Sequence, residues 1–401
     1  MQICFFEDKL LTNFHPLTLT RPVDDLRVGI LTIAAKWEKA LQAVNTTRLV
    51  RNEIKGVFEG GEIDEGQSCL WINARYLPSH SLITRVKDLA LGNCLQMDDT
   101  VIAAHVDGSD SKNWHEKGKP NFHSLFVLEA GTFTSIRHLW DLFAFNSNEI
   151  QNDIGLLDPD RSENSDIANL SVFENKSEIF IEDSATIEAG CILDARKGPI
   201  FIGKGATIMA GSIIYGPAAI CEKATIKAGA KIYEGSTIGP VCKVGGEVNN
   251  TIFHSYSNKA HDGFVGNSIF GQWCNLGADS NTSNLKNNYS TIRIVDWETE
   301  EELETDQQFF GTIMGDHSKT AINTQLNTGT ICGVSSNIFS SDFPPKFIPS
   351  FSWVGSNVIQ TYKTEKALET MEAMMARRDV SMSEAYKTMM RHISQNSRHR
   401  K

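Results

Sequence analysis

Aliphatic residues stand six positions apart through the middle of the chain without interruption. They are Ile202, Ile208, Ile214, Ile220, Ile226, Ile232, Ile238 and Val244. A period of six fits neither an α-helix nor an ordinary strand, but it is typical of a parallel β-helix in which each hexad forms one side of a triangular coil. We therefore expect about eighteen residues per turn, with the aliphatic side chains on the axis.

The repeat extends beyond this run, with two interruptions. It begins with Ile181, slips by three residues at 195–199, and returns after Val244 with Phe264, Phe270 and Leu276. It then breaks in the polar stretch 279–310 and resumes through Ile338. We expect a β-helix over 178–345, with a bulge at the slip and an excursion from one coil at the break.

The first part of the chain has a different pattern. Short apolar runs at 1–6, 68–72 and 124–129 alternate with segments of helical period such as 30–44. This alternation favours an α/β domain over 1–157, closed by a helix near its end. A linker rich in Asp, Ser and Asn is expected over 158–177, and a helical tail over 346–401.

Composition restricts the functions open to this chain. The net charge of −11 argues against non-specific binding of nucleic acid, which calls for a basic face. No apolar run approaches the ~20 residues that span a bilayer, so we expect no membrane insertion. The eight cysteines form no CxxC pair and read as reduced core residues of a cytoplasmic protein.

One polar stretch, 245–289, interrupts this otherwise apolar scaffold. His261 is flanked there by Lys259 and Asp262 and follows Glu247 by fourteen residues. We expect stacked coils to bring these two side chains together, and a carboxylate beside an imidazole orients it as a general base. We interpret His261 as a candidate base, with a purely structural histidine as the open alternative.

The same stretch resembles the acetyltransferase domain of the bifunctional GlmU family, in particular a shorter GlmU-like branch from Bacteroidetes. The resemblance implies a left-handed β-helix, a homotrimer with ligands between chains, and acetyl transfer from acetyl-CoA to an amino-sugar 1-phosphate. It implies that His261 is the base and that Glu247 and Asn284 orient it. Asn275 would bind the sugar, and the backbone N–H of Ala278 would bind the thioester oxygen.

The resemblance also implies basic residues that hold the sugar phosphate, namely Lys227, Lys286 and Arg293. Three positions depart from the family pattern. Phe264 replaces a common Tyr, Asn249 stands where a phosphate-binding Lys is usual, and Asp279 replaces a Gly. We expect these departures to affect which amino sugar accepts the acetyl group.

The N-terminal domain resembles sugar-phosphate nucleotidyltransferases, as its stretches 14–30 and 71–78 indicate. The glycine-rich loop that cradles the triphosphate in that family is missing, and Asn73 stands where an Asp holds Mg²⁺. The resemblance implies a nucleoside triphosphate or sugar nucleotide held by Arg21, Arg27 and Arg75. We expect slow nucleotidyl transfer or none, with Mg²⁺ as an optional cofactor.

Two other functions remain open. Three imidazoles, from His254, His261 and His317, would be needed for a zinc site of the carbonic-anhydrase type, although their spacing is out of phase with the coils. A non-catalytic alternative makes the β-helix a trimeric scaffold and the first domain a degenerate nucleotide-sugar sensor.

Overall fold

The structure is a computed structural model that describes residues 1–159, 166–168, 170–356 and 358–397. The described chain divides into two compact units. The first unit comprises Met1–Phe14, Arg21–Leu26 and Leu31–Arg137, and the second comprises His15–Thr20, Arg27–Ile30 and the chain from His138 onward.

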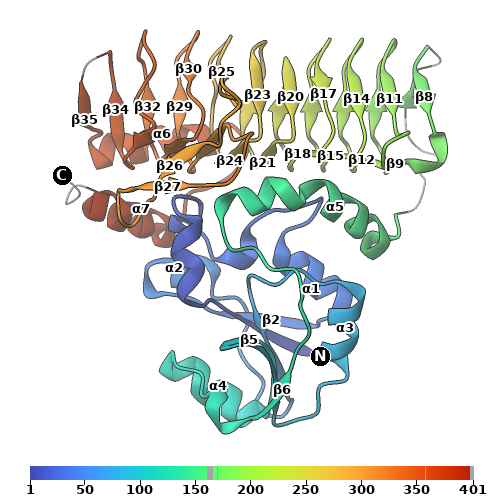
Figure 1. The fold of residues 1–401 in the computed structure, drawn as a ribbon, viewed down its shortest axis with the longest axis vertical. Helices are drawn as coiled ribbons and strands as arrows, with labels where there is room; N and C mark the ends of the chain where they lie inside the picture. The colour runs from blue at the N-terminus through green and yellow to red at the C-terminus, as the bar shows by residue number, and fades with distance from the viewer. Residues whose placement is uncertain (160–165, 169, 357, 398–401) are drawn as a thin grey trace. The chain divides into compact units, whose positions relative to one another are not determined.

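The first unit is an α/β domain built on one mixed six-stranded sheet, as the sequence predicts (Figure 1). The strands in sheet order are β2 (Asn45–Leu49), β1 (Gln2–Phe6), β3 (Cys69–Asn73), β5 (Thr100–Val106), β4 (Asn93–Met97) and β6 (Phe126–Glu129). The helices are α1 (Ile33–Leu41), α2 (Asn52–Phe58), α3 (His80–Lys87) and α4 (Gly108–Lys117), with short 3-10 turns at Lys9–Phe14, Val23–Asp25 and Phe122–Ser124. Strand β1 pairs in parallel with both β2 and β3, so residues that follow β1 and β3 meet at one edge of the sheet.

The second unit is a parallel β-solenoid of three long sheets (Figure 1). The first sheet contains β7 (Asp166–Ile167), β10 (Thr186–Ile187), β13 (Thr207–Ile208), β16 (Thr225–Ile226), β19 (Lys243–Val244) and β22 (Asn258–Lys259). The second contains β8 (Val172–Glu174), β11 (Ile192–Asp194), β14 (Ile213–Tyr215), β17 (Lys231–Ile232), β20 (Glu247–Asn249) and β23 (Phe264–Gly266). The third contains β9 (Ile179–Ile181), β12 (Ile200–Ile202), β15 (Ala218–Ile220), β18 (Ser236–Ile238), β21 (Ile252–Ser255), β24 (Ile269–Gln272), β28 (Thr312–Met314), β31 (Thr330–Cys332) and β33 (Phe347–Ile348).

Shorter elements complete the second unit. Strands β25 (Asn281–Thr282) and β30 (Gln325–Leu326) pair with each other, and β29 (Lys319–Thr320), β32 (Asn337–Ile338), β34 (Ser352–Val354) and β35 (Ile359–Thr361) form a further sheet. The polar excursion carries an antiparallel hairpin of β26 (Arg293–Val295) and β27 (Glu302–Glu304). The helices are α5 (Leu139–Leu157), α6 (Thr364–Ala376) and α7 (Glu384–Ser397), with 3-10 turns at Leu17–Leu19 and Lys176–Glu178.

The hexad prediction is confirmed by strand register and by burial. Ile208 pairs with Ile226, eighteen positions on, and Ile226 pairs with Val244. All eight predicted aliphatic residues are fully buried in the solenoid core. Ile187 instead pairs with Ile208, twenty-one positions on, so the slip at 195–199 adds three residues to one coil as expected.

Several predicted boundaries differ from the structure. Strands β7 and β8 fall inside the predicted linker and pair with β10 and β11, so the solenoid starts before residue 178. Residues 160–165 and 169 of that linker lie outside the described residues. Strands β33 and β34 continue the coils past residue 345, and two helices follow in the expected tail. After Val244 it is Val265 that is fully buried, while Phe264 is half-buried, because the coils there are shorter than eighteen residues.

Helix α5 forms where expected but belongs to the second unit rather than the first. The Asn146 amide accepts from Gly29 N–H at 2.6 Å and donates to Gly235 C=O at 2.7 Å and to Thr237 Oγ1 at 3.0 Å. Gly29 has φ +83°, and a Cβ there would clash with the carboxylate of Asp153. These contacts place α5 against part of the third sheet, where it contacts β15 and β18.

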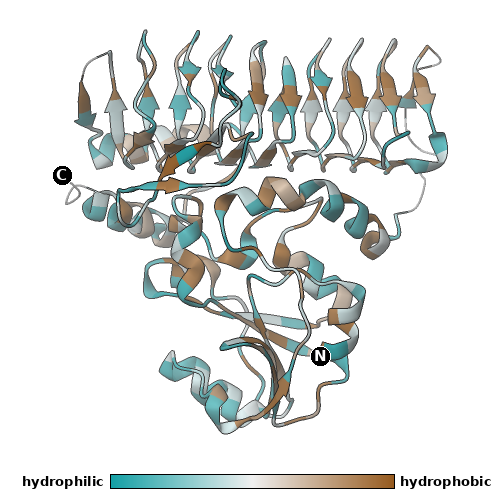
Figure 2. Cartoon of the chain, in the orientation of Figure 1, coloured by the Kyte–Doolittle hydropathy of each residue, from teal (hydrophilic) through white to brown (hydrophobic). Residues whose placement is uncertain are grey.

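Hydropathy changes along the solenoid. Figure 2 shows mostly apolar colour in β14 and more hydrophilic colour in β29. Among the helices that the structure describes, none is long and apolar enough to cross a membrane. The expected left-handed winding stays a prediction, since strand pairing does not fix it.

Candidate functional site

The candidate site lies at the corner between the first and second sheets. His261 is exposed and comes two residues after Lys259 at the end of β22, while Ala278 comes two residues after the buried Leu276 of the next coil. The N–H of Asp279 donates to the C=O of Asp262 at 3.1 Å, so the two corners stack directly on each other. The structure thus brings His261 and Ala278 together at equivalent points of adjacent coils.

The backbone at Ala278 has the donor that the resemblance implies. Its C=O accepts from the N–H of Asn323 at 2.8 Å, and the N–H groups of its neighbours Gly277 and Asp279 are both engaged in the stack. Within the described part of the chain, the N–H of Ala278 makes no hydrogen bond. An N–H at a bend of this kind is available for an oxyanion.

Lys259 supports this corner from inside. Its side chain is 1 % exposed and sits in the apolar column beside Val244. Its ammonium donates to the C=O of Gly245 at 2.9 Å and to the C=O of His261 at 2.7 Å. Burial lowers the pKa of Lys259 to about 8, although the carboxylates of Asp262 and Asp279 oppose the change. A buried cation is costly, so its two tethers to the corner are the structural reason for its presence.

Sequence reasoning noted Lys259 only as a neighbour of His261. The six-residue period gave no sign that it points inward, because Val244 and Lys259 are paired across a coil of only fifteen residues. A lysine in register with a buried aliphatic column is the signal that would have identified it.

Glu247 does not pair with His261 within the described residues. It stands on the outer side of β20, where a carboxylate oxygen lies 4.0 Å from the ammonium of Lys231. Along the second sheet Lys231, Glu247 and Phe264 are register neighbours. The carboxylate of Glu247 therefore lies in a row of outward-facing side chains on the second sheet. Lys231 is a cation in this row that was not predicted from the sequence.

The two candidate asparagines lie on different sides of the corner. Asn284 donates from its amide to the Oδ1 of Asn267 at 2.8 Å and has no hydrogen bond to His261 among the described residues. Asn275 bridges Asn258 and Lys319 through its backbone in the extension of the first sheet. Asn275 is thus in the coil of Ala278, whereas Asn284 lies further along the chain.

The predicted phosphate-binding cations separate into two groups. Lys286 donates to the C=O of Thr291 at 2.6 Å, and Arg293 pairs with Glu304 at 2.8 Å. Both line a cavity of about 470 Å³ beside the β26–β27 hairpin, together with Lys346, and not the corner of His261.

Lys227 belongs to a different cationic cluster, which we define as Lys227, Lys243, Arg377 and Arg378. Arg378 donates to the Oδ1 of Asn258 at 3.0 Å, and Asn258 is the register neighbour of Lys243. The positive charge of Arg378, then burial, then Lys227 and Arg377 lower the pKa of Lys243. Within the described chain these four cations have no carboxylate partner, which suits an anionic group.

In the first unit, Arg21 and Arg75 are engaged by carboxylates. Arg21 is 1 % exposed and pairs with Asp25 at 2.7 Å. Arg75 is 3 % exposed, holds Asp8 with its Nη2 at 2.6 Å and donates from Nη1 to the C=O of Ile136. Arg27 belongs to the second unit and donates to the C=O of His254 at 3.0 Å, and its role in holding a nucleotide stays a prediction.

The region around Asn73 does not fit Mg²⁺. Asp8 follows β1 and Asn73 ends β3, and the Asn73 amide donates to Asp8 at 2.9 Å. Burial would raise the pKa of Asp8, but hydrogen bonds from Arg75 and Asn73 and the charge of Arg75 lower it overall. The guanidinium of Arg75 thus already neutralises the negative charge of Asp8, and Mg²⁺ would need that charge for its own coordination. Asp8, Asn73 and Arg75 line a cavity of about 780 Å³ with Lys9, Asp99 and His123.

The three histidines of the zinc alternative have separate surroundings. His254 is buried beside Ser255, and His317 contacts the hydroxyl of Tyr386 at 2.9 Å, whereas His261 is exposed. Within the described residues no three His, Cys, Asp or Glu side chains are grouped so as to hold a metal.

Comparison with known proteins supports the GlmU-like resemblance. Residues 3–162 match the family described as sugar nucleotidyl transferase. The chain is 27 % identical over 120 residues to the bifunctional protein GlmU of Methanococcus aeolicus, a match that covers 30 % of this chain and 25 % of that protein. The chain therefore spans about a quarter of the length of this relative.

Solved structures similar to this chain include acyltransferases. UDP-N-acetylglucosamine acyltransferase from Campylobacter jejuni is 13 % identical, with a TM-score of 0.28, and the match covers 58 % of this chain and 95 % of that one. UDP-N-acetylglucosamine O-acyltransferase from Moraxella catarrhalis is 16 % identical, with a TM-score of 0.24, over 58 % of this chain and 93 % of that one.

Proposed function

We propose that the solenoid transfers the acetyl group of acetyl-CoA to the amine of an amino-sugar 1-phosphate such as glucosamine 1-phosphate, as a step of nucleotide-sugar biosynthesis of the UDP-N-acetylglucosamine type. The observation that carries this proposal is the stack of two corners, joined by the hydrogen bond between Asp279 and Asp262. It gives one place with an exposed imidazole and an unengaged backbone N–H, the two groups that amide formation from a thioester needs.

The chemistry requires no covalent enzyme intermediate. His261 accepts a proton from the sugar ammonium, and the free amine attacks the thioester carbonyl carbon. The N–H of Ala278 donates to the oxyanion that forms, and collapse of the intermediate breaks the C–S bond and releases the CoA thiolate, which takes up a proton. One such donor contributes about 10²–10³ in rate in well-studied enzymes, so its placement matters as much as that of the base.

Two cationic groups fit the phosphate of the acceptor. Lys231 lies on the second sheet beside Glu247, and the cluster around Lys227 lies on the first sheet, on the other side of the same corner. We assign the sugar phosphate to Lys227, as the resemblance implies, and keep Asn275 as a contact to the sugar. In this proposal Glu247 and Asn284 orient His261 only once a second chain of a homotrimer completes the site.

The N-terminal domain has the fold of a nucleotidyltransferase, but we propose that its transfer activity is low. The ion pair between Asp8 and Arg75 stands where phosphates and metal would meet, and Asn73 adds no charge. Sugar nucleotides bind in the cavity next to this pair, with Lys9 as the available cation in place of the three predicted arginines.

The proposal is tested by following thiol release from acetyl-CoA. We expect release that depends on glucosamine 1-phosphate and saturates with it, and a product in which the amine is acetylated. N-acetylglucosamine 1-phosphate is the matched control, since its amine is already blocked. Release without an acceptor amine, or none with any amino-sugar phosphate, would favour the scaffold alternative.

A further inference from the structure

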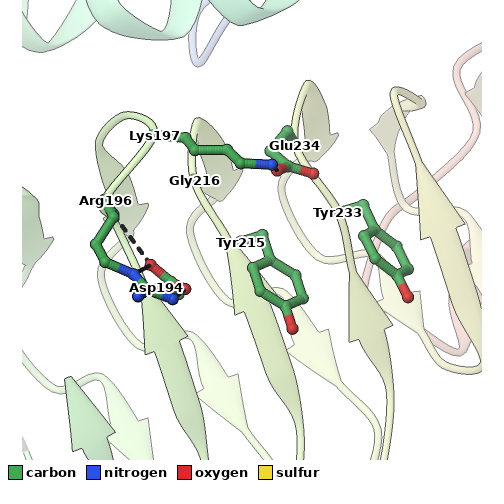
Figure 3. Close-up of a pocket in the computed structure, with 7 residues that line it drawn as sticks. All are labelled: Asp194, Arg196, Lys197, Tyr215, Gly216, Tyr233 and Glu234. Atoms are coloured by element: carbon green, nitrogen blue, oxygen red, sulfur yellow. Dashed lines mark hydrogen bonds and ion pairs between the residues drawn. The ribbon is translucent and has the colours of Figure 1, made fainter. Parts of the chain in front are cut away.

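The coil with three extra residues forms one wall of a cavity that the proposed function does not use. The cavity has a volume of about 550 Å³ and is lined by Asp194, Arg196, Lys197, Tyr215, Gly216, Tyr233 and Glu234 (Figure 3). Arg196 and Lys197 come from the inserted segment 195–199, and the two tyrosines come from the second sheet. The interruption of the repeat thus has a structural consequence at the surface.

Tyr215 and Tyr233 stand on neighbouring strands of the second sheet and line this cavity as a stacked pair, which we call the aromatic plate. Their rings are within 15° of parallel, with centroids 5.4 Å apart, and both are half-buried. Figure 3 shows the rings side by side with their hydroxyls pointing the same way. In such a stack each ring keeps one face turned away from its neighbour, and an aromatic face of this kind is a surface against which a flat-sided ring packs.

The charged side chains around the plate cancel one another. Arg196 holds Asp194 through Nε at 2.9 Å and through Nη2 at 2.5 Å. Lys197 pairs with Glu234 at 2.7 Å. The rim thus carries no net charge, unlike the cationic cluster around Lys227, and gives a phosphate or another ion no electrostatic advantage. It does offer both acceptors and donors, because carboxylates accept hydrogen bonds and guanidinium and ammonium groups donate them.

From this combination we infer that the plate binds a neutral pyranose ring. A pyranose has an apolar face of C–H groups that packs on aromatic rings, and hydroxyls around its edge that both donate and accept. The paired charges around Tyr215 and Tyr233 match that edge without requiring a charge on the ligand. This site is separate from the corner of His261, and it does not depend on the proposed acetyl transfer.

The inference is tested by NMR titration of the full-length protein with methyl β-D-glucopyranoside, with selective labelling of tyrosine rings. We expect the resonances of Tyr215 and Tyr233 to shift saturably at millimolar sugar, while Tyr289, which is 67 % exposed, does not shift. Tyr215→Ala and Tyr233→Ala should each weaken binding about tenfold, equivalent to about 1.4 kcal/mol. Tyr233→Phe keeps the ring and should bind nearly as well as the wild type, and Tyr289→Ala is the matched control.

Three results would overturn the inference. The first is a titration in which no tyrosine resonance shifts up to saturating sugar in a chain that circular dichroism shows to be folded. The second is equal or tighter saturable binding of uridine on the same two rings, which would make the plate a site for a base. The third is protection of both rings in the absence of sugar, lost on dilution, which would make the plate a contact between copies of the chain.

Discussion

The ammonium of Lys259 lies 2.7 Å from the backbone carbonyl oxygen of His261 and holds it from inside the solenoid. The same ammonium holds the carbonyl of Gly245 on the preceding coil. The buried ammonium of Lys259 therefore fixes the backbone at His261, and a fixed backbone helps to position the exposed imidazole of the candidate base.

Replacing Lys259 by Met tests this positioning. The methionine fills the column but cannot tether the corner, so we expect turnover to fall about 10²-fold, as misplacement of about 1 Å costs in other enzymes. The melting temperature should rise or stay level, because the desolvated charge is gone. If Lys259 had only a structural role, its loss would not lower turnover while leaving the melting temperature level or higher.

Lys319→Met is the matched control for that variant. Burial also lowers the pKa of Lys319 to about 8, and its ammonium donates to the C=O of His317 at 2.8 Å rather than to the His261 corner. We expect a similar change in stability with turnover close to that of the wild type. Equal loss of turnover in both variants would argue against a specific role for Lys259.

The two buried lysines predict how stability depends on pH. Their folded pKa of about 8 lies below the ordinary value of 10.5, so between these pH values the unfolded chain binds more protons than the folded chain. The free energy of unfolding is therefore highest above about pH 10.5, where both amines are neutral in both states. It falls as the pH drops from about 10.5 to about 8 and is constant below that range. The difference in free energy of unfolding between wild type and Lys259→Met, from urea titrations at pH 7 and pH 9.5, should change by on the order of 1–3 kcal/mol. A constant difference would contradict the lowered pKa.

The solenoid core makes a second stability prediction. Ile226 is fully buried in the column predicted from the hexads, whereas Thr225 before it is only half-buried. Ile226→Asp should prevent folding, since an unpaired buried charge costs several kcal/mol against a total of ~5–15. Thr225→Asp should fold normally, as judged by circular dichroism and chromatography. Similar behaviour of the two variants would mean that the predicted column is not the core.

The N-terminal domain is tested by pyrophosphate release from UTP, dTTP, GTP and CTP with N-acetylglucosamine 1-phosphate and Mg²⁺. We expect a turnover number far below the ~10 s⁻¹ typical of enzymes, because the carboxylate of Asp8 is already paired with Arg75. Ordinary turnover with any of these nucleotides would show that the ion pair opens and that the domain is an active nucleotidyltransferase.

The sequence was sufficient for the parts of the fold with a fixed period. Eight hexads predict the core from Ile202 to Val244, and the register bears out each position. Prediction failed where coils become shorter, since Ile238 pairs with Phe253 only fifteen positions on. Each such shortening changes which side chain faces the axis, and for this reason Lys259 and Val265 were missed.

Contacts distant in sequence could not be predicted from pattern. Helix α5 forms near the end of the predicted first domain, but its Asn146 bonds to Gly29 and Thr237, and both α5 and residues 27–30 belong to the solenoid unit. Likewise, the resemblance supplied His261 and Ala278, and only the hydrogen bond between Asp279 and Asp262 brought them to one corner.

The most direct test of acetyl transfer at this corner compares wild type with His261→Ala in the assay of thiol release from acetyl-CoA with glucosamine 1-phosphate. The account predicts a fall in turnover of ~10²–10⁴, the usual span for a positioned base, with acetyl-CoA affinity unchanged by calorimetry. Turnover by His261→Ala equal to that of the wild type would contradict it.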